Sequence, residues 1–278
     1  ADVVPRLIQP ALEQKLGQRI LIEHRPGAGG NVGAQAVLAA PADGHTMLMA
    51  PTNVLVINQF VFRDMKFDPL VDFVPISLIA EVPLILQVHP SVPAQTLGEL
   101  IAHAKANPGK LNYGSTGIGT SSHLSGYMLS KRTGADYTHI PYKGAEVLKD
   151  LLAGRVQFMF ATIPSVIAHI NAGTLRPVAV TSVKRSRSMP NVPTVVESGF
   201  PDFEAGSWFG FFAPKGTPEH VIATVNKAVN EALPALEAQM VREGADPVGG
   251  SPAQFGQFIR SEYEKWKVVV RESGATAE

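Results

Sequence analysis

Residues 112–123 read NYGSTGIGTSSH, and the rest of the chain is best interpreted outward from this stretch. The run Lys110–Tyr113 before it predicts a strand, and apolar residues at 124, 127 and 128 after it suit one face of a helix. A strand, a loop of small residues and a helix direct backbone N–H groups toward a cavity, because the first four amides of a helix lack internal partners. The helix dipole adds about half a positive charge there.

The same stretch has the chemistry of an anion site. Its glycines let a ligand approach the backbone closely, and five hydroxyl side chains can bind oxygen atoms: Ser115, Thr116, Thr120, Ser121 and Ser122. A carboxylate- or phosphate-sized anion would fit such a loop. A simpler interpretation is equally open: the hydroxyls could merely cap the helix that follows.

Composition excludes several functional classes. The chain has 278 residues, 45% of them hydrophobic, which is enough for one large or two mid-sized domains. Its 24 basic and 24 acidic residues give a net charge of +0, which argues against a nucleic-acid partner. There is no cysteine, and the eight histidines show no metal-ligand spacing, so we expect no metal and no cofactor.

Predicted strands alternate with helices, which favours an α/β fold with parallel sheets. Two long apolar segments, 82–88 and 206–214, look like strands that cross between domains, and the proline-rich run His89–Pro93 looks like a hinge. We therefore expect a discontinuous first domain, 1–88 with 212–278, and an inserted second domain, 89–211. A ligand cleft is expected between them, at the strand ends.

The first part of the chain predicts a helix, a strand, a tight turn and a second strand. The chain opens directly into a helical pattern that ends at Gly17, so we expect further residues upstream; Arg19–Glu23 then predicts a buried strand. The run RPGAGGNVG at 25–33 has the wrong register for a dinucleotide fingerprint and is interpreted as a tight turn. The next strand, 45–50, ends at Thr52 and Asn53, which could contact a ligand; Asn53 could equally cap the next segment.

The sequence argues against an enzyme. No nucleophile elbow is present, and no acid pair follows a strand. His123 could act as a base for Ser121 or Ser122, which makes a serine hydrolase a competing hypothesis, but residues so close in sequence rarely align for this. The loop is expected to hold an anion without transforming it.

Several longer motifs carry a family resemblance: EHRPGAGGNVG at 23–33, KLNYGS at 110–115, HIPYKG at 139–144 and VPTV at 192–195. Together they resemble the Bug-type solute receptors, the periplasmic binding proteins of tripartite tricarboxylate transporters. The resemblance implies a two-domain type II periplasmic-binding-protein fold, each domain a mostly parallel sheet flanked by helices. It also implies a periplasmic, monomeric receptor that captures a small organic acid and delivers it to a membrane permease or, alternatively, to a sensor kinase.

Two departures from the family pattern affect the expected ligand. The family's Pro-Gly-Gly loop, which contacts the carboxylate, would lie just before Asp2, where this chain begins. Ala161 stands where members often carry an acid, which makes an amino-acid ligand less expected than a di- or tricarboxylate, an aromatic acid or a nicotinate-like compound. The complete set of expected ligand contacts is Thr52, Asn53, Ser115, Thr116, Gly117, Gly119, Thr120, Ser121, His123, Ala161, Thr162, Ser165 and Trp208.

Overall fold

The computed structural model describes residues 3–277, and the chain in it divides into two compact units. Unit 1 comprises the chain up to Glu81 and from Trp208 onward; unit 2 is the inserted segment Val82–Ser207. Two strands, β2 (Phe73–Val88) and β7 (Gly206–Pro214), contain these boundaries. The divisions come seven and four residues earlier than the boundaries at 88/89 and 211/212 that the sequence suggests.

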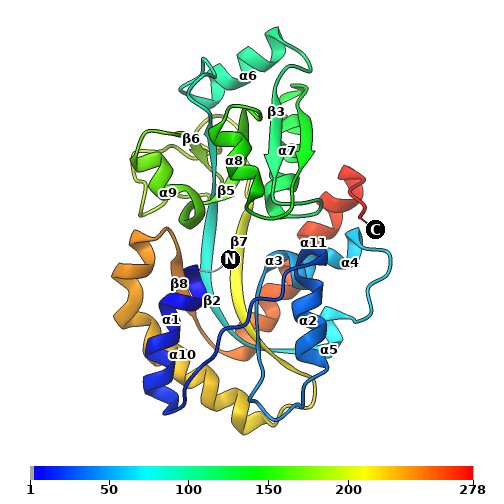
Figure 1. Ribbon diagram of the computed structural model, residues 1–278, viewed down its shortest axis with the longest axis vertical. Coiled ribbons are helices and arrows are strands. Elements are labelled where there is room, and N and C mark those ends of the chain that lie inside the picture. Colours follow the sequence, from blue (N-terminus) through cyan, green and yellow to red (C-terminus); the bar gives the residue numbers. More distant parts are fainter. Residues whose placement is uncertain (1–2, 278) are drawn as a thin grey trace. The chain divides into compact units, whose positions relative to one another are not determined.

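Unit 1 consists mainly of helices around short antiparallel strand pairs. Strand β1 (Leu48–Pro51) pairs with β7, and β8 (Asp246–Gly249) pairs with the first half of β2, both antiparallel. Figure 1 shows α1 (Val3–Leu16) beside α10 (Glu219–Arg242). The other helices of unit 1 are α2 (Asn31–Leu38), α3 (Thr52–Val56), α4 (Asn58–Val61), α5 (Pro69–Asp72) and α11 (Pro252–Ser273), with a 3-10 turn at Ala28–Gly30.

The segment Arg19–Glu23 is not the strand that the sequence predicts. It pairs with no strand in the described residues, and Leu21 is 82% exposed. Side chains of α1 take the place of a strand partner: Gln9 donates to the Ile20 carbonyl at 2.7 Å, and the Ile20 N–H donates to Glu13 at 2.8 Å. A strand needs a neighbouring strand for its backbone groups, and the apolar pattern alone could not show whether one is available.

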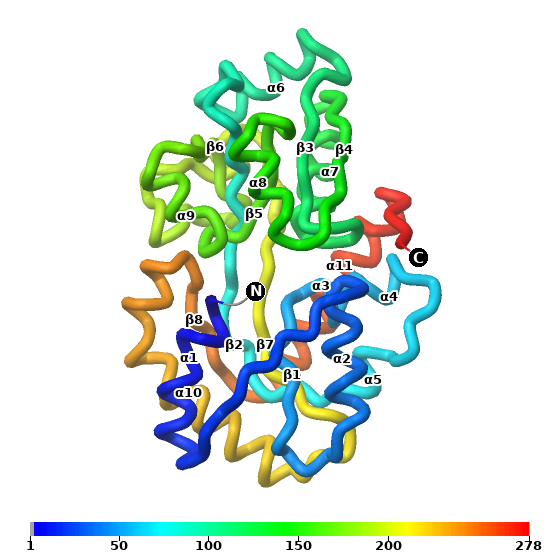
Figure 2. The backbone as a smooth tube through the Cα atoms, in the orientation of Figure 1, coloured from blue at the N-terminus to red at the C-terminus, as the bar shows by residue number. Residues whose placement is uncertain are grey.

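Unit 2 is an α/β sheet in which the strands linked by helices run parallel. Strand β3 (Asn112–Ser115) pairs in parallel with β4 (Thr138–Pro141) and with β5 (Phe158–Thr162), as the tube in Figure 2 shows for β3 and β4. The second half of β2 pairs antiparallel with both β5 and β6 (Arg176–Val180). The helices are α6 (Leu97–Ala106), α7 (Ser121–Thr133), α8 (Glu146–Leu152) and α9 (Ile163–Asn171).

The prediction of mostly parallel sheets therefore needs correction. It holds for the helix-linked strands of unit 2, but the chain has a mixed sheet, and the strand pairs of unit 1 given above are antiparallel. The alternation of strand and helix fixes only the direction of strands joined by helical crossovers. Strand β2 enters unit 2 from unit 1, not through such a crossover, so it runs against its neighbours.

The core of unit 2 fills the space between the sheet and helices α8 and α9. Ile85 of β2 lies in this cluster with Met159 and Ala161 of β5. Apolar side chains of α8 and α9 complete it: Val147, Leu151, Ile163 and Val166. The burial of these residues fixes the sheet from which the three loops described next extend.

Candidate functional site

Three loops of unit 2 start at the same edge of its sheet. The register pairs Ser115 at the end of β3 with Pro141 at the end of β4, and parallel β5 ends nearby at Thr162. Backbone bonds then join the first two loops: the Tyr142 N–H donates to the Ser115 carbonyl and the Gly144 N–H to the Thr116 carbonyl, both at 3.1 Å. The carboxyl edge of parallel strands is where α/β proteins bind ligands.

The loop between β3 and α7 is a tight turn that ends in a helix cap. Gly117 and Gly119 have φ of 142° and 77°, a conformation that favours glycine. The Thr120 hydroxyl donates to the Gly117 carbonyl at 2.8 Å and accepts the His123 N–H at 3.4 Å, so Thr120 is the N-cap of α7. Of the two roles that the sequence left open for the Thr120 hydroxyl, the structure shows the helix cap.

Some N–H groups of this loop remain unused. Those of Gly117, Gly119, Thr120 and His123 have acceptors within the loop. The N–H groups without a hydrogen-bond partner among residues 3–277 include those of Ile118, Ser121 and Ser122. Ser121 is half-buried and is the first residue of the 13-residue α7, where N–H groups point away from the helix.

The hydroxyl side chains of this loop divide into buried and partly exposed ones. Ser115 is fully buried; its Oγ accepts the Gly117 N–H at 3.2 Å and lies 2.7 Å from Nε2 of His139. Ser122 is also buried and donates to the Phe160 carbonyl of β5. Both serines therefore hold the loop to the sheet, whereas Thr116 and Ser121 are partly exposed.

His123 does not form the arrangement a serine hydrolase needs. Its Nδ1 accepts the Gly119 N–H at 3.1 Å, and burial lowers the pKa of its imidazole to about 4. Neither Ser121 nor Ser122 makes a hydrogen bond to it among the described residues. A base whose acceptor nitrogen is occupied and whose pKa is far below neutrality cannot activate those hydroxyls well.

A second group of side chains stabilises the loop after β4. The Tyr142 hydroxyl donates to Asp150 Oδ2 at 2.8 Å, and Arg155 lies 2.7 Å from the other carboxylate oxygen. These hydrogen bonds, that of Tyr142 first, lower the pKa of Asp150. Burial, and then the bond to Asp150, raise the pKa of Tyr142. Because this loop bonds the backbone at Ser115 and Thr116, Tyr142 indirectly supports the β3–α7 loop.

The third loop, after β5, brings two more of the expected residues to this edge. Thr162 donates to the Ser165 hydroxyl at 3.2 Å, and Ser165 donates back to the Thr162 carbonyl at 2.7 Å. Ala161 belongs to the core cluster and is 5% exposed, which leaves little of its side chain for a ligand. Thr162 and the exposed Ser165 are therefore the better candidates in this loop.

In unit 1, Thr52 and Asn53 have internal hydrogen-bond partners. Thr52 is 1% exposed and accepts the Trp208 N–H at 2.8 Å. Asn53 donates to the Gly29 carbonyl at 2.6 Å. Asn58 donates to the same carbonyl at 3.2 Å and to Asn31 Oδ1 at 2.6 Å. These asparagines fix the Ala28–Gly30 turn, and the capping role considered for Asn53 is not observed.

Trp208 lies in the core of unit 1 and not on a ligand surface. It is 2% exposed, and its indole N–H donates to Glu262 Oε2 at 3.1 Å. Trp266 donates to the same oxygen, also at 3.1 Å. The ring of Trp208 packs edge-on against Phe255 and Phe258. We therefore leave Trp208 out of the proposed ligand contacts.

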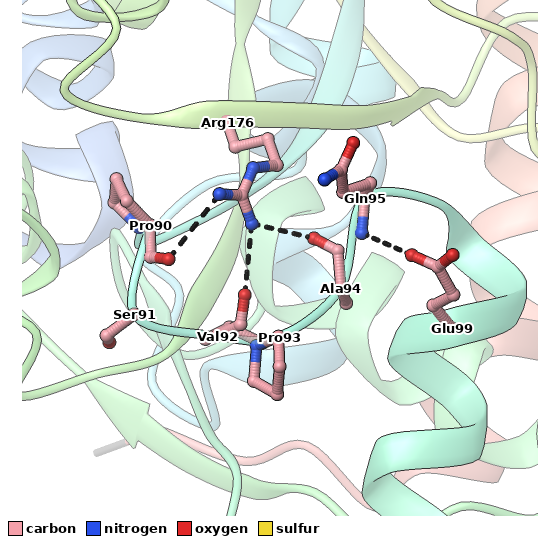
Figure 3. Close-up of a pocket in the computed structure, with 8 residues that line it drawn as sticks. All are labelled: Pro90, Ser91, Val92, Pro93, Ala94, Gln95, Glu99 and Arg176. Atoms are coloured by element: carbon pink, nitrogen blue, oxygen red, sulfur yellow. Dashed lines mark hydrogen bonds between the residues drawn. The ribbon is translucent and has the colours of Figure 1, made fainter.

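A pocket of about 470 Å³ lies elsewhere in unit 2, between the segment 90–95 and β6 (Figure 3). The Arg176 guanidinium points into that segment and donates to the Val92 and Ala94 carbonyls, each at 3.0 Å. The predicted hinge at 89–93 is thus fastened to β6 within unit 2. None of the ligand contacts expected from the sequence lines this pocket.

Metal-binding clusters and membrane-spanning helices are both absent from residues 3–277. No group of three or more His, Asp or Glu side chains there could hold a metal ion. None of the helices in this range combines the length and the apolar character that a bilayer span requires.

Comparison with known proteins identifies the family. The model of the Tripartite tricarboxylate transporter family receptor matches residues 4–275. The chain belongs to this family. Protein BugT from Bordetella pertussis is 38% identical over 278 residues, which cover 99% of this chain and 85% of that protein.

Solved members of this receptor family have the same fold. R. palustris Rpa4515 with adipate matches with a TM-score of 0.95 and 36% identity, covering 99% of this chain and 94% of that one. MatC (Rpa3494) from Rhodopseudomonas palustris with bound malate matches with a TM-score of 0.88 and 31% identity, covering 97% and 94%. These matches confirm both the family resemblance and the α/β periplasmic-binding-protein fold. The family and its solved members are solute-binding receptors.

Proposed function

We propose that this receptor captures a small carboxylate at the carboxyl edge of the unit 2 sheet. The observation that carries the proposal is the group of unpartnered N–H donors, that of Ile118 in the loop and those of Ser121 and Ser122 in the first turn of α7. No charged side chain occurs between 112 and 122, so backbone dipoles would supply the attraction. A helix N-terminus favours an anion by about 0.3–2 kcal/mol, and each N–H bond to a charged oxygen adds about 1.5–3 kcal/mol.

The chemistry of the ligand is suggested by the relatives. Rpa4515 was solved with adipate and MatC with malate, and both are four- to six-carbon dicarboxylates. We propose the same class for this chain. The hydroxyls of Thr116, Ser121, Thr162 and Ser165 lie in the loops at this edge of the sheet and are partly or fully exposed, so we propose them as further ligand contacts. Hydroxyls and amides can bind a carboxylate without a salt bridge.

The family description supports the rest of the proposed role. A receptor of tripartite tricarboxylate transporters would work in the periplasm and deliver its ligand to the membrane components of such a transporter. In this role the ligand is released chemically unchanged. Incubation of adipate or malate with the protein should therefore return each acid intact, and the appearance of a product would contradict the proposal.

The sharpest test removes one N–H group while leaving the helix intact. Proline is well tolerated at the first position of a helix, and Thr120, with φ of −72° and ψ of 157°, already has the conformation preferred before proline. Ser121→Pro deletes the free N–H and the hydroxyl; Ser121→Ala deletes the hydroxyl alone. The difference between the two variants isolates the backbone donor.

Calorimetric titration with adipate and with malate gives the measurement. We expect Ser121→Pro to bind about tenfold or more weakly than Ser121→Ala, which corresponds to one hydrogen bond to a charged oxygen. Neutral adipamide should bind the wild-type protein far less tightly than adipate. Equal affinity of the two variants, with both folded by circular dichroism, would show that the anion is bound elsewhere.

A further inference from the structure

Four aromatic rings form one continuous row beneath the candidate loop. Strand register places Tyr113 of β3 opposite both Phe158 of β5 and His139 of β4, and their rings stack at 5.6 and 4.8 Å. His123 of α7 ends the row, with its ring centroid 3.9 Å from that of His139 and the planes within 16°. The row therefore joins the sheet to the first turn of α7.

The two histidines at the end of this row hold the glycines of the loop. Nδ1 of His123 accepts the Gly119 N–H at 3.1 Å, so this nitrogen bears no proton and the proton of the neutral ring is on Nε2. His139 acts through Ser115: its Nε2 lies 2.7 Å from the Ser115 Oγ, which accepts the Gly117 N–H at 3.2 Å. Both glycine amides flanking Ile118 are thereby fixed.

We propose that His123 and His139 are positioning residues of the ligand site, a neutral stacked pair that fixes the loop so that the N–H groups of Ile118 and Ser121 face the ligand. This inference rests on the proposed carboxylate site. It assigns His123 a role different from the direct ligand contact expected from the sequence, and it adds His139. His123 accepts the Gly119 N–H, and His139 holds the Ser115 hydroxyl that accepts the Gly117 N–H. The N–H groups of Ile118 and Ser121 are left free for the ligand.

The surroundings of the pair favour its neutral form. Burial lowers the pKa of His123 to about 4, and burial followed by the charge of His123 lowers that of His139 to about 3. The other groups against the rings are the uncharged Tyr113, whose hydroxyl donates to the His123 carbonyl at 3.3 Å, and Ser115. No carboxylate contributes to either pKa.

A proton on His123 would therefore act directly on the loop. Protonated Nδ1 is a donor and faces the Gly119 N–H, another donor, so this bond is lost. The charged ring would also lie against the ring of His139, whose centroid is 3.9 Å away. The loop conformation, and with it ligand affinity, should depend on His123 remaining unprotonated.

Two variants separate this role from simple packing. His123→Phe keeps a ring in the row but has no acceptor, whereas His123→Asn loses the ring but places an amide oxygen near the position of Nδ1. We expect adipate to bind His123→Phe about tenfold more weakly than wild type at pH 7.5, and His123→Asn to recover most of that loss. Wild-type affinity should fall relative to that of His123→Asn as the pH drops from 6 to 3.5. The ligand's own titration cancels in this ratio.

Equal adipate binding by His123→Phe and wild type, or identical pH profiles of wild type and His123→Asn, would overturn the inference. A ligand-free measurement separates it from the proposed function. Nitrogen-15 shifts at pH 7 should show His123 with its proton on Nε2, and the Gly119 amide signal should move as that ring is protonated. A proton on Nδ1 at pH 7 would refute the positioning role, whether or not any carboxylate binds.

Discussion

Thr120 is the residue whose role the structure defines most sharply. Its hydroxyl closes the Gly117–Thr120 turn and caps α7 at once. Thr120→Ala should lower the free energy of unfolding by about 1 kcal/mol, the usual cost of a lost cap, and should weaken adipate binding by about tenfold because the turn loosens. Thr120→Ser keeps the hydroxyl and is the control. Urea unfolding measures the change in stability, and calorimetry measures the change in adipate affinity. If Thr120→Ala bound adipate like wild type, the turn would not contribute to ligand binding.

The histidine pair also predicts how stability depends on pH. Both imidazoles have a folded-state pKa below the ordinary value of 6.5, so the unfolded chain binds their protons more tightly. Their contribution is fully present above pH 6.5 and is lost as the pH falls toward about 4 for His123 and about 3 for His139. Urea unfolding at several pH values should show stability decreasing across this window, and less steeply in His123→Asn. A stability independent of pH from 6.5 to 4 would contradict the prediction.

At the scale of single residues, the sequence predicted positions better than roles. It pointed to the loop between Ser115 and His123 because the pattern of glycines and hydroxyls is local. It could not show that Ser115 is buried or that His139 stacks on His123, since both depend on the register of β3 with β4. The role of Asn58 could not be predicted either, because its partner, the Gly29 carbonyl, is 29 residues away in the sequence.

Helix α7 and helix α6 provide a matched pair of glycines. A Cβ at Gly126 in α7 would overlap the Tyr113 ring, whereas a Cβ at Gly98 in α6 would meet nothing closer than the Thr96 hydroxyl at 4.0 Å. Gly98→Ala should raise the free energy of unfolding by up to about 1 kcal/mol through helix propensity. Gly126→Ala should lower it by about 1–3 kcal/mol through overpacking. Chemical denaturation of both variants tests this, and a stabilised Gly126→Ala would show that the Tyr113 ring can move aside.

The helices were predictable where their ends are encoded locally. The capping boxes of α6 and α11, Thr96 with Glu99 and Ser251 with Gln254, each join residues only three positions apart, so their pattern is visible in the sequence. Strands were harder, because their partners are distant. The strand expected at 82–88 is the second part of the longer β2, which begins at Phe73, and Arg19–Glu23 forms no strand.

For the whole molecule, the proposed function predicts stabilisation by ligand. A ligand that binds only the folded state at a hundredfold excess over its Kd stabilises it by about 2.7 kcal/mol. For a chain of this size the melting temperature should then rise by roughly 5–10 °C. Differential scanning calorimetry with adipate measures the shift, with adipamide as the control. An identical melting temperature at saturating adipate would count against a carboxylate receptor.

The overall α/β class followed from the alternation of strands and helices, while the mixed character of the sheet did not. Alternation describes neighbours along the chain, and β2 and β7 join strands that are far apart in sequence. The family motifs added what periodicity alone could not supply, because several long matches in order are more specific than any one glycine loop.

The two tryptophans that share the Glu262 carboxylate should determine the fluorescence of the protein. The chain has two tryptophans, Trp208 and Trp266, and both are buried indoles that donate to the same oxygen of Glu262 in unit 1. Native fluorescence should therefore peak at short wavelength and move to longer wavelength only when this part of the protein opens. Trp208 directly follows Ser207, where unit 2 ends, and its indole packs within unit 1 against Phe255 and Phe258. A change of emission on adding adipate would thus report a change in the core of unit 1, where both indoles lie.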